Sequence, residues 1–124
     1  MTGLTFDTGA LLALERNRQR IVEVTQAALR CGLRITVPAA VITEWWRGRT
    51  DLREDILASV RVEPLTDSIA KLAGEAIGAV KGATAIDAIV MASAALRGDL
   101  VYTSDVGDLE KLRVQFPAVR VLRV

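Results

Sequence analysis

The sequence predicts an α/β fold, a three-layer α/β/α sandwich with a five-stranded parallel sheet, in one domain over residues 1–124. Short apolar runs alternate with segments whose apolar residues recur at helical spacing. Strands that are separated by helices imply parallel pairing with right-handed crossovers. No repeat, low-complexity tract or linker interrupts the alternation, and 124 residues suit a single core.

The first fifty residues predict two strands and three helices. An apolar run over residues 4–6 predicts the first strand, and a helix begins over residues 10–16. Apolar residues then recur on one helix face that includes a cysteine, expected to be buried, and a glycine follows as a helix stop. Residues 33–37 are strand-like, and a proline suits the first turn of the third helix. These positions are Ile21, Val24, Ala28, Cys31, Gly32 and Pro38.

The rest of the chain predicts three more strands. Residues 48–50 break the third helix, a short helix spans 51–59, and strands are expected at 60–65, 100–103 and 119–124. Asp67 or Ser68 can cap a long helix. Thr84 opens the next helix, Gly98 closes it, and a last helix spans 106–116. Arginines in the last strand fit a charged sheet edge. The inward face of the long helix is predicted to carry Ile69, Ala73, Ala76, Ile77 and Val80.

The composition excludes several kinds of chemistry. The chain has no histidine and one cysteine, which removes Ser-His-Asp triads, Cys-His nucleophiles, an internal disulfide and most zinc sites. Any metal must then be held by oxygen ligands, which favours Mg²⁺ or Mn²⁺. The net charge of +1 does not by itself indicate nucleic-acid binding, but arginine dominates the cations and binds phosphate well. With neither an export signal nor a membrane-spanning run, a cytoplasmic protein without membrane contact is expected.

Acidic residues lie where the predicted strands and helices begin or end. Carboxylates in apolar stretches cost free energy unless a cation or a hydrogen bond meets them. In an open parallel sheet, sites form beyond the carboxyl ends of the strands where the strand order reverses. If the first and fourth strands are neighbours there, these carboxylates converge in one crevice. The residues are Asp7, Glu44, Asp87, Asp105 and Asp108.

Helix capping is an alternative explanation for most of these acids. Asp7 could be an N-cap, and Thr84 with Asp87 is similar to a capping box. Asp105 and Asp108 could be an N-cap and an acid in the first turn. Glu44, expected in mid-helix, has no cap role, and its alternative is a solvent-exposed helix face. The joint pattern therefore supports a site more strongly than any single acid does.

Four segments containing these acids resemble motifs of the PIN-domain family, and within it the VapC-type toxins of toxin–antitoxin pairs. In order they are FDTGALLAL, VPAAVITEWWRG, ATAIDAIVMASA and VYTSDVGDLEKL, and they extend over almost the whole chain. Three departures are that Trp46 follows the acid of the second motif, that Leu109 replaces a frequent Phe, and that the segment before Asp87 lacks the His or extra acid of many relatives. None of them removes a core carboxylate.

The resemblance implies cleavage of RNA with Mg²⁺ or Mn²⁺, silencing by a VapB-like antitoxin protein, and a homodimer. It makes Asp7, Glu44, Asp87 and Asp105 the catalytic acids. It makes Asp7, Asp87, Asp105 and Asp108 the metal ligands. Thr8, Thr103, Ser104 and Arg47 would contact the substrate.

Other expectations concern the basic and aromatic residues around the crevice. Arg47, Arg49, Arg53 and Lys81 could follow an RNA backbone or be ordinary surface charges. Trp45 and Trp46 are adjacent on a helix and cannot both face one core, so one is expected inside and the other at a partner or an RNA base. Two alternative functions are a non-catalytic PIN-like binding module and a phospho-acceptor signalling domain. The second is disfavoured because the first strand is followed by Asp7 alone and the last strand by no lysine.

Overall fold

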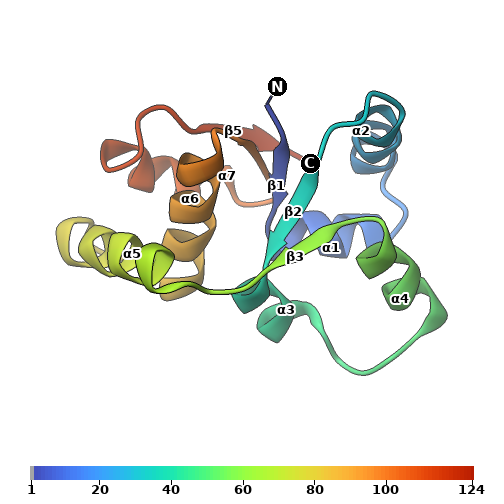
Figure 1. Ribbon diagram of the computed structural model, residues 1–124, viewed down its shortest axis with the longest axis horizontal. Coiled ribbons are helices and arrows are strands. Elements are labelled where there is room, and N and C mark those ends of the chain that lie inside the picture. The colour runs from blue at the N-terminus through green and yellow to red at the C-terminus, as the bar shows by residue number, and fades with distance from the viewer. Residues whose placement is uncertain (1) are drawn as a thin grey trace.

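A five-stranded sheet in which every strand is parallel to its neighbours forms the centre of the molecule. The computed structural model describes residues 2–124. The strand order is β3-β2-β1-β4-β5, and the predicted α/β/α fold is confirmed (Figure 1). The strands are β1 (Leu4–Phe6), β2 (Ile35–Pro38), β3 (Arg61–Glu63), β4 (Leu100–Thr103) and β5 (Arg120–Arg123).

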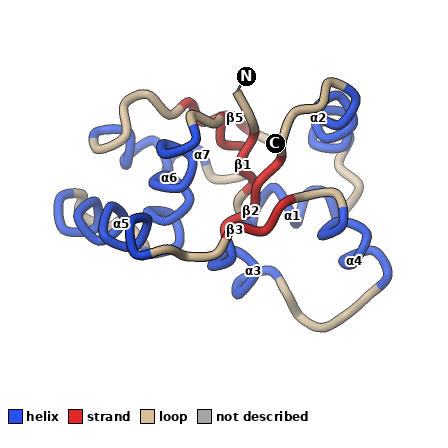
Figure 2. The backbone as a smooth tube through the Cα atoms, viewed as in Figure 1, coloured by secondary structure: helices blue, strands red, loops and turns tan. Residues whose placement is uncertain are grey.

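Helices cover the sheet in two layers, as the tube of Figure 2 shows. One layer contains α1 (Thr8–Glu15), α2 (Gln19–Arg30), α3 (Ala39–Trp45) and α4 (Asp51–Ala58). The other contains α5 (Asp67–Ala79), α6 (Ala85–Arg97) and α7 (Val106–Glu110), and a 3₁₀ segment, Lys111–Val114, continues from α7. No helix within residues 2–124 is long and apolar enough to cross a membrane.

The core is built on the two central strands and on α6. Every residue of β1 and β2 is buried, as expected for a parallel sheet covered on both faces. Helix α6 contacts β1, β2 and β4, and small side chains let its backbone approach the sheet closely. Each fully buried large apolar side chain contributes about 1.5–3 kcal/mol, so Phe6, Val90 and Met91 stabilise this contact.

The strand order reverses at β1, which pairs with β2 on one side and with β4 on the other. This is the switch point at which a crevice is expected in an open parallel sheet. Asp7 directly follows β1, and Asp105 lies two residues after the last residue of β4. The condition set for convergence, that the first and fourth strands are neighbours, is met, so both carboxylates start from the same edge of the sheet.

Several element boundaries differ from those predicted, mostly because of capping. Gly32 has φ 70°, and the Leu33 N–H donates to the Ala28 carbonyl, so the capping turn after α2 extends to Leu33 and β2 begins only at Ile35. Pro38 ends β2 and precedes α3 instead of lying inside its first turn. Strand β3 is only three residues long, and α7 ends at Glu110 where the 3₁₀ segment begins.

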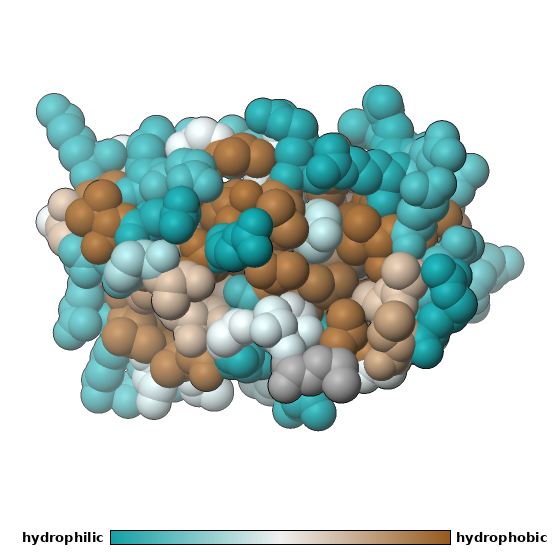
Figure 3. Space-filling model, turned by 90° about the horizontal axis from the view of Figure 1, so that it is seen from above, coloured by the Kyte–Doolittle hydropathy of each residue, from teal (hydrophilic) through white to brown (hydrophobic). Residues whose placement is uncertain are grey.

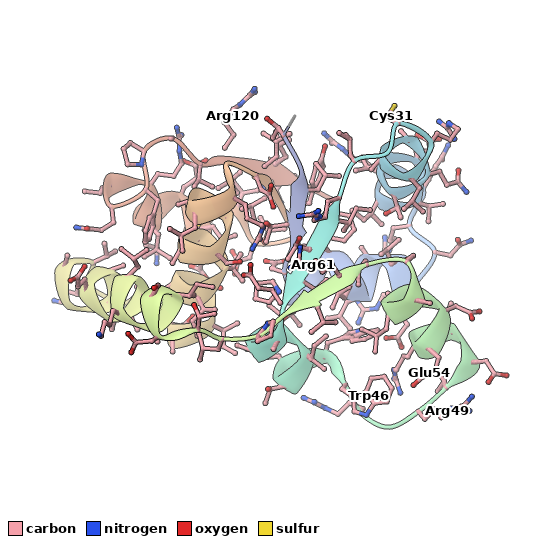
Figure 4. All side chains as sticks on the ribbon, viewed as in Figure 1. Cys31, Trp46, Arg49, Glu54, Arg61 and Arg120 are labelled. Atoms are coloured by element: carbon pink, nitrogen blue, oxygen red, sulfur yellow. The ribbon has the colours of Figure 1, made fainter. Side chains whose placement is uncertain are left out.

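Three side-chain predictions were wrong. Cys31 is exposed at the outer end of α2, as Figure 4 shows, because it is the C-cap residue of that helix. The N-cap of α5 is Thr66, whose hydroxyl accepts the Ile69 N–H at 3.2 Å, and not Asp67 or Ser68. Ile77 was expected on the inward face of α5, yet its side chain is 40% exposed.

Large exposed hydrophobic side chains are spread over several elements. On the face drawn in Figure 3, hydrophobic residues lie among hydrophilic ones. Scattered exposure of this kind is normal for a folded domain and does not by itself locate a partner surface. The exposed side chains are Leu29, Leu52, Val62, Leu65, Ile77, Leu96 and Val114.

A polar network around Arg97 joins α6 to β1 and β3. The Arg97 guanidinium donates to Asp99 Oδ2 at 2.9 Å and to Thr5 Oγ1 at 2.7 Å, and it also pairs with Glu63. Ser93 Oγ donates to Glu63 Oε1 at 2.6 Å. Burial alone would raise the pKa of Glu63, but the hydrogen bonds from Arg97 and Ser93 lower it below its usual value. Arg97 therefore neutralises two carboxylates that would otherwise be poorly solvated.

We predict that Arg97→Ala lowers the free energy of unfolding by about 3 kcal/mol, because it leaves Asp99 and Glu63 without their cation. Chemical denaturation followed by circular dichroism measures this change. The matched control is Lys71→Ala, which removes a pair to Asp67 in which both side chains are largely exposed, and it should change stability by less than about 0.5 kcal/mol. Equal effects of the two substitutions would contradict the role given to Arg97.

Candidate acidic site

A cavity of 280 Å³ lies beyond the carboxyl ends of β1 and β4. All five acids singled out in the sequence line it, and none of its lining residues is a lysine or an arginine. The start of α6 and the helix α3, which contact each other, contribute to the same cavity. The lining residues are Asp7, Thr8, Gly9, Glu44, Thr84, Ile86, Asp87, Ser104, Asp105 and Asp108.

Asp7 combines a capping role with a place in the cavity wall. Its Oδ1 accepts the Ala10 N–H at 3.0 Å, so it is the N-cap of α1, as the capping alternative supposed. Its own N–H donates to the Tyr102 carbonyl at 3.4 Å and ties the end of β1 to β4. The residue is only 8% exposed. Capping therefore explains how Asp7 is oriented, but it leaves a buried negative charge at the cavity.

Glu44 is exposed and belongs to the last turn of α3, not to the middle of a longer helix as predicted. Its Oε1 accepts a hydrogen bond from Thr8 Oγ1 at 2.6 Å. This bond joins the first residue of α1 to α3 across the cavity. Thr8 therefore holds the Glu44 carboxylate in a defined place on the cavity wall.

The position of α3 is set by a second contact below Glu44. The Trp45 indole N–H donates to Glu15 Oε1 at 2.8 Å, and Arg53 Nη2 pairs with Glu15 Oε2 at 3.2 Å. Trp45 is buried, whereas Trp46 is half-buried. The two rings pack edge to face with their centroids 6.0 Å apart. Trp45 is thus the tryptophan in the core, as expected of one of the two, but Trp46 is only partly exposed. Arg53 is paired with Glu15.

Asp87 lies in the first turn of α6. Thr84 Oγ1 accepts the Asp87 N–H at 3.2 Å, which is the first bond of a capping box. The Asp87 side chain is half-buried beside the cavity. Here too the capping alternative is correct for the backbone, while the carboxylate is one of the cavity's negative charges.

Asp105 and Asp108 are placed by the short helix α7. Asp105 is the N-cap residue, but its side chain makes no capping hydrogen bond, and its N–H donates to Thr103 Oγ1 at 2.9 Å. Asp108, one turn later, lies 3.3 Å from Lys111 Nζ. Capping therefore does not account for the Asp105 carboxylate, which is exposed at the cavity.

The pKa values show that the cavity disfavours negative charge. Burial, followed in effect by the charge of Asp87, raises the pKa of Asp7 to about 6, although hydrogen bonds from Thr103 and Ala10 oppose the shift. Burial also raises the pKa of Asp87, with the charges of Asp108, Glu44 and Asp105 adding to it. The hydrogen bond with Asp108 raises the pKa of Asp105, while that bond and Lys111 lower the pKa of Asp108.

The donor set is of the kind that a hard divalent cation binds, since it consists of carboxylate and hydroxyl oxygens. A cation would also relieve the repulsion that raises the pKa values of Asp7 and Asp87. Within residues 2–124, however, no three acidic side chains are arranged to hold one ion as they stand. Glu44 is turned to Thr8, and Asp108 to Lys111. The residues are of the chemical type that binds a metal ion. Their side chains would therefore have to rotate to hold one.

Gly9 makes this cavity possible, and sequence reasoning assigned it no such role. A Cβ on Gly9 would lie 2.0 Å from Ser104 Oγ and 2.9 Å from the Ser104 backbone nitrogen. The start of α1 can therefore approach the loop after β4 only because residue 9 has no side chain. The sequence signal was a glycine two residues after the strand-terminal Asp7, but its close contact is decided by the tertiary fold.

The predicted substrate contacts are placed differently from one another. Thr8 and Ser104 line the cavity, whereas Thr103 is fully buried and its Oγ1 accepts the backbone N–H of Asp105. Arg47 does not line the cavity, because its guanidinium bonds to the carbonyls of Thr43 and Trp46 on its own helix end. A place for Arg47 at the substrate is thus not supported by its position.

Solved structures show the same fold along the whole chain. No protein-family model matches the sequence, and no curated protein matches it either. A DNA-bound VapBC from Salmonella typhimurium aligns with TM-score 0.77 and 15% identity over 99% of this chain and 98% of that chain. A VapBC2 from Rickettsia felis, bound to a promoter DNA fragment, aligns with TM-score 0.77 and 9% identity over 98% of each chain. A toxin–antitoxin complex from Klebsiella pneumoniae aligns with TM-score 0.74 and 19% identity over 98% of this chain and 96% of that chain.

At these identities the likeness establishes the fold, and the chain is a PIN-like α/β/α domain. The structural neighbours include the toxin–antitoxin proteins that the sequence motifs resemble, so the resemblance is confirmed for the fold. The acidic cavity occupies the switch point of that fold.

We predict that, with a metal chelator in the buffer, Asp7→Asn raises the free energy of unfolding at about pH 8. At about pH 4 the same substitution should raise it much less. The pKa of Asp7 is raised from 3.8 to about 6, so the folded state binds the proton more tightly than the unfolded chain. Stability therefore falls as the pH rises through this window. Asn keeps an oxygen that accepts the Ala10 N–H, and it removes the charge. At pH values above this window the substitution should therefore raise the free energy of unfolding by about 2–3 kcal/mol. Denaturation at both pH values measures the gain, and an equal gain at both would contradict the assignment.

We predict that Gly9→Ala lowers the free energy of unfolding by about 1–3 kcal/mol, because the new methyl group collides with the Ser104 side chain and backbone. Gly74→Ala is the control. Gly74 lies in α5 with open space around its Cβ position, so alanine there should stabilise the helix by about 1 kcal/mol. Thermal denaturation of the two variants tests this, and a neutral Gly9→Ala would show that the approach is not tight.

Proposed function

We propose that this protein is a metal-dependent endoribonuclease and the toxin component of a type II toxin–antitoxin pair. The observation that carries the proposal is the cavity at the switch point, in which five carboxylates meet without any basic lining residue. The pKa of Asp7 is raised to about 6 there, which means that its negative charge is unfavourable in the cavity. A bound cation would make that charge favourable. The PIN-like fold and the VapBC neighbours support the same function.

Asp7, Asp87, Asp105 and Asp108 would hold Mg²⁺ or Mn²⁺. When bound, the ion supplies a Lewis acid that neutralises charge on a phosphodiester and lowers the pKa of a bound water. Glu44, which is exposed and held by Thr8, would accept a proton from the attacking water. Thr103 orients the loop that carries Asp105, and Ser104, which lines the cavity, would present its hydroxyl to the RNA. Hydrolysis by water needs no protein nucleophile, which agrees with a chain that has no histidine.

An antitoxin protein and a second copy of the chain are the proposed protein partners. Neighbours of this fold were solved as VapBC or toxin–antitoxin complexes, two of them on DNA. A ribonuclease of this kind requires an inhibitor in its own cell, and a positively charged side chain inserted into the acidic cavity would neutralise it. A cytoplasmic location follows from this proposal, since RNA and an antitoxin would be met there.

We predict that the purified protein cleaves single-stranded RNA with Mg²⁺ or Mn²⁺, and that EDTA abolishes the cleavage. Asp7→Ala, Asp105→Asn and Glu44→Gln should each lower the rate by about 100-fold or more, because each removes a group acting on the ion or the proton. Gel analysis of a labelled RNA measures the rates. Glu75→Gln is the control, since Glu75 is exposed on α5 away from the cavity, and it should leave the rate unchanged. Cleavage that persists in EDTA and in Asp7→Ala would refute the proposal.

A non-catalytic PIN-like module is the second candidate. It is favoured by one observation, that no three acidic side chains within residues 2–124 stand ready to hold an ion. Calorimetric titration with millimolar Mg²⁺ or Mn²⁺ separates the candidates. Absence of binding would favour the module, whereas binding that is weakened in Asp7→Asn and Asp87→Asn would favour the enzyme.

A further inference from the structure

A second cavity, of 240 Å³, lies next to the acidic one and has the opposite charge. Three arginines line it, and no aspartate or glutamate does. Gly9 and Ser104 line both cavities, so the two share a wall. The lining residues are Gly9, Leu12, Ala13, Arg16, Arg18, Ser104, Arg123 and Val124.

The turn at the end of α1 brings two of the arginines together. Asn17 has φ 54°, a left-handed conformation that asparagine tolerates better than most residues. The Asn17 N–H donates to the Leu14 carbonyl at 3.0 Å, and the Arg18 N–H to the Ala13 carbonyl at 2.9 Å, which is a Schellman motif. The chain therefore folds back over the end of α1, with Arg16 and Arg18 on either side of Asn17.

The third arginine comes from the last strand. Arg123 stands opposite Thr103 in the register of β5 and β4, and the Val124 N–H donates to the Thr103 carbonyl at 3.0 Å. Thr103 is the residue that bonds to the acidic loop from beneath. The end of β5 is thus attached to the same strand end that carries Ser104 and Asp105.

These arginines have no anion of their own. Among residues 2–124, none of Arg16, Arg18 and Arg123 takes part in a side-chain hydrogen bond or an ion pair, and all three are exposed. Some other arginines of the molecule are engaged, such as Arg53 with Glu15 and Arg97 with Glu63. Unneutralised guanidinium groups around one concave surface attract an anion, and their planar fork matches a phosphate.

We propose that this arginine cavity, defined by Arg16, Arg18 and Arg123, binds a backbone phosphate of the RNA strand next to the one cleaved. The inference rests on the proposed function and names how that substrate is held. A strand that enters the acidic cavity is repelled there, so it needs attraction close by, and the shared wall at Ser104 gives it a continuous path. A phosphate chain fits this path better than an acidic peptide, which would gain nothing at the acidic cavity.

The test measures binding in EDTA, so that cleavage plays no part. A fluorescent single-stranded RNA is titrated with wild type and with the triple variant Arg16→Gln, Arg18→Gln, Arg123→Gln, by anisotropy at several salt concentrations. The variant should bind about 10- to 100-fold more weakly at low salt. The slope of log affinity against log salt should fall by about 0.7, since the cavity holds one phosphate and each phosphate contact on a single strand contributes about 0.7.

The control removes three other exposed arginines, with Arg30→Gln, Arg61→Gln and Arg120→Gln. Arg120 begins the strand that Arg123 ends, and Arg61 lies on β3 (Figure 4). Arg30 ends α2, and none of the three lines either cavity. The control should keep most of the affinity and of the salt slope. Equal losses in both variants would overturn the proposal, because they would indicate general charge attraction and no defined site.

A lysine triple variant at Arg16, Arg18 and Arg123 keeps the charge and should restore part of the affinity, which also excludes misfolding as the cause. Unchanged RNA binding in the glutamine variant, with lost binding of an oligo-aspartate peptide, would overturn the proposal in favour of a protein partner. The outcomes are separable from the proposed function. A wild type that binds RNA through the arginine cavity without cleaving it would refute the nuclease alone, whereas cleavage without arginine-dependent binding would refute this inference alone.

Discussion

The parallel pairing of β1 with both β2 and β4 is the constraint on which the site depends. This pairing puts the ends of β1 and β4 side by side, so that Asp7 and the loop carrying Asp105 leave the sheet at one edge. The charges brought together there repel one another, and burial adds to the cost, as the raised pKa of Asp7 shows. The fold therefore holds a group of carboxylates in a place that is unfavourable for them individually.

The surroundings of the cavity hold those carboxylates in position by hydrogen bonds and close packing. Gly9 allows α1 to approach the Ser104 loop, and Thr8 fixes Glu44 from across the cavity. Glu15 holds Trp45 and thereby the end of α3. These contacts use no cation within the cavity, so its negative potential is left available for a ligand. A cavity wall with unbalanced negative charge attracts a cationic ligand.

Charge is separated over a short distance on this side of the molecule. The acidic cavity and the arginine cavity meet at Gly9 and Ser104, and neither is lined by a charged side chain of the other sign. The network of Arg97 with Glu63 and Asp99, in contrast, brings charges of both signs together. That network stabilises the fold, whereas the arginines of the second cavity have no ion-pair partner among residues 2–124 and are assigned to a ligand.

The sequence by itself determined the fold class, the order of the strands and helices, and which acids come together, because these depend on local periodicity and on the ends of strands. Capping also followed from sequence at Asp7 and Thr84. Only the tertiary structure decided the strand ends near Gly32 and Pro38, the exposure of Cys31, and the burial of Thr103 beneath the site. It also decided which arginines face the cavities, Arg123 and not Arg47, because a long flexible side chain takes its place from whichever partners the fold brings near.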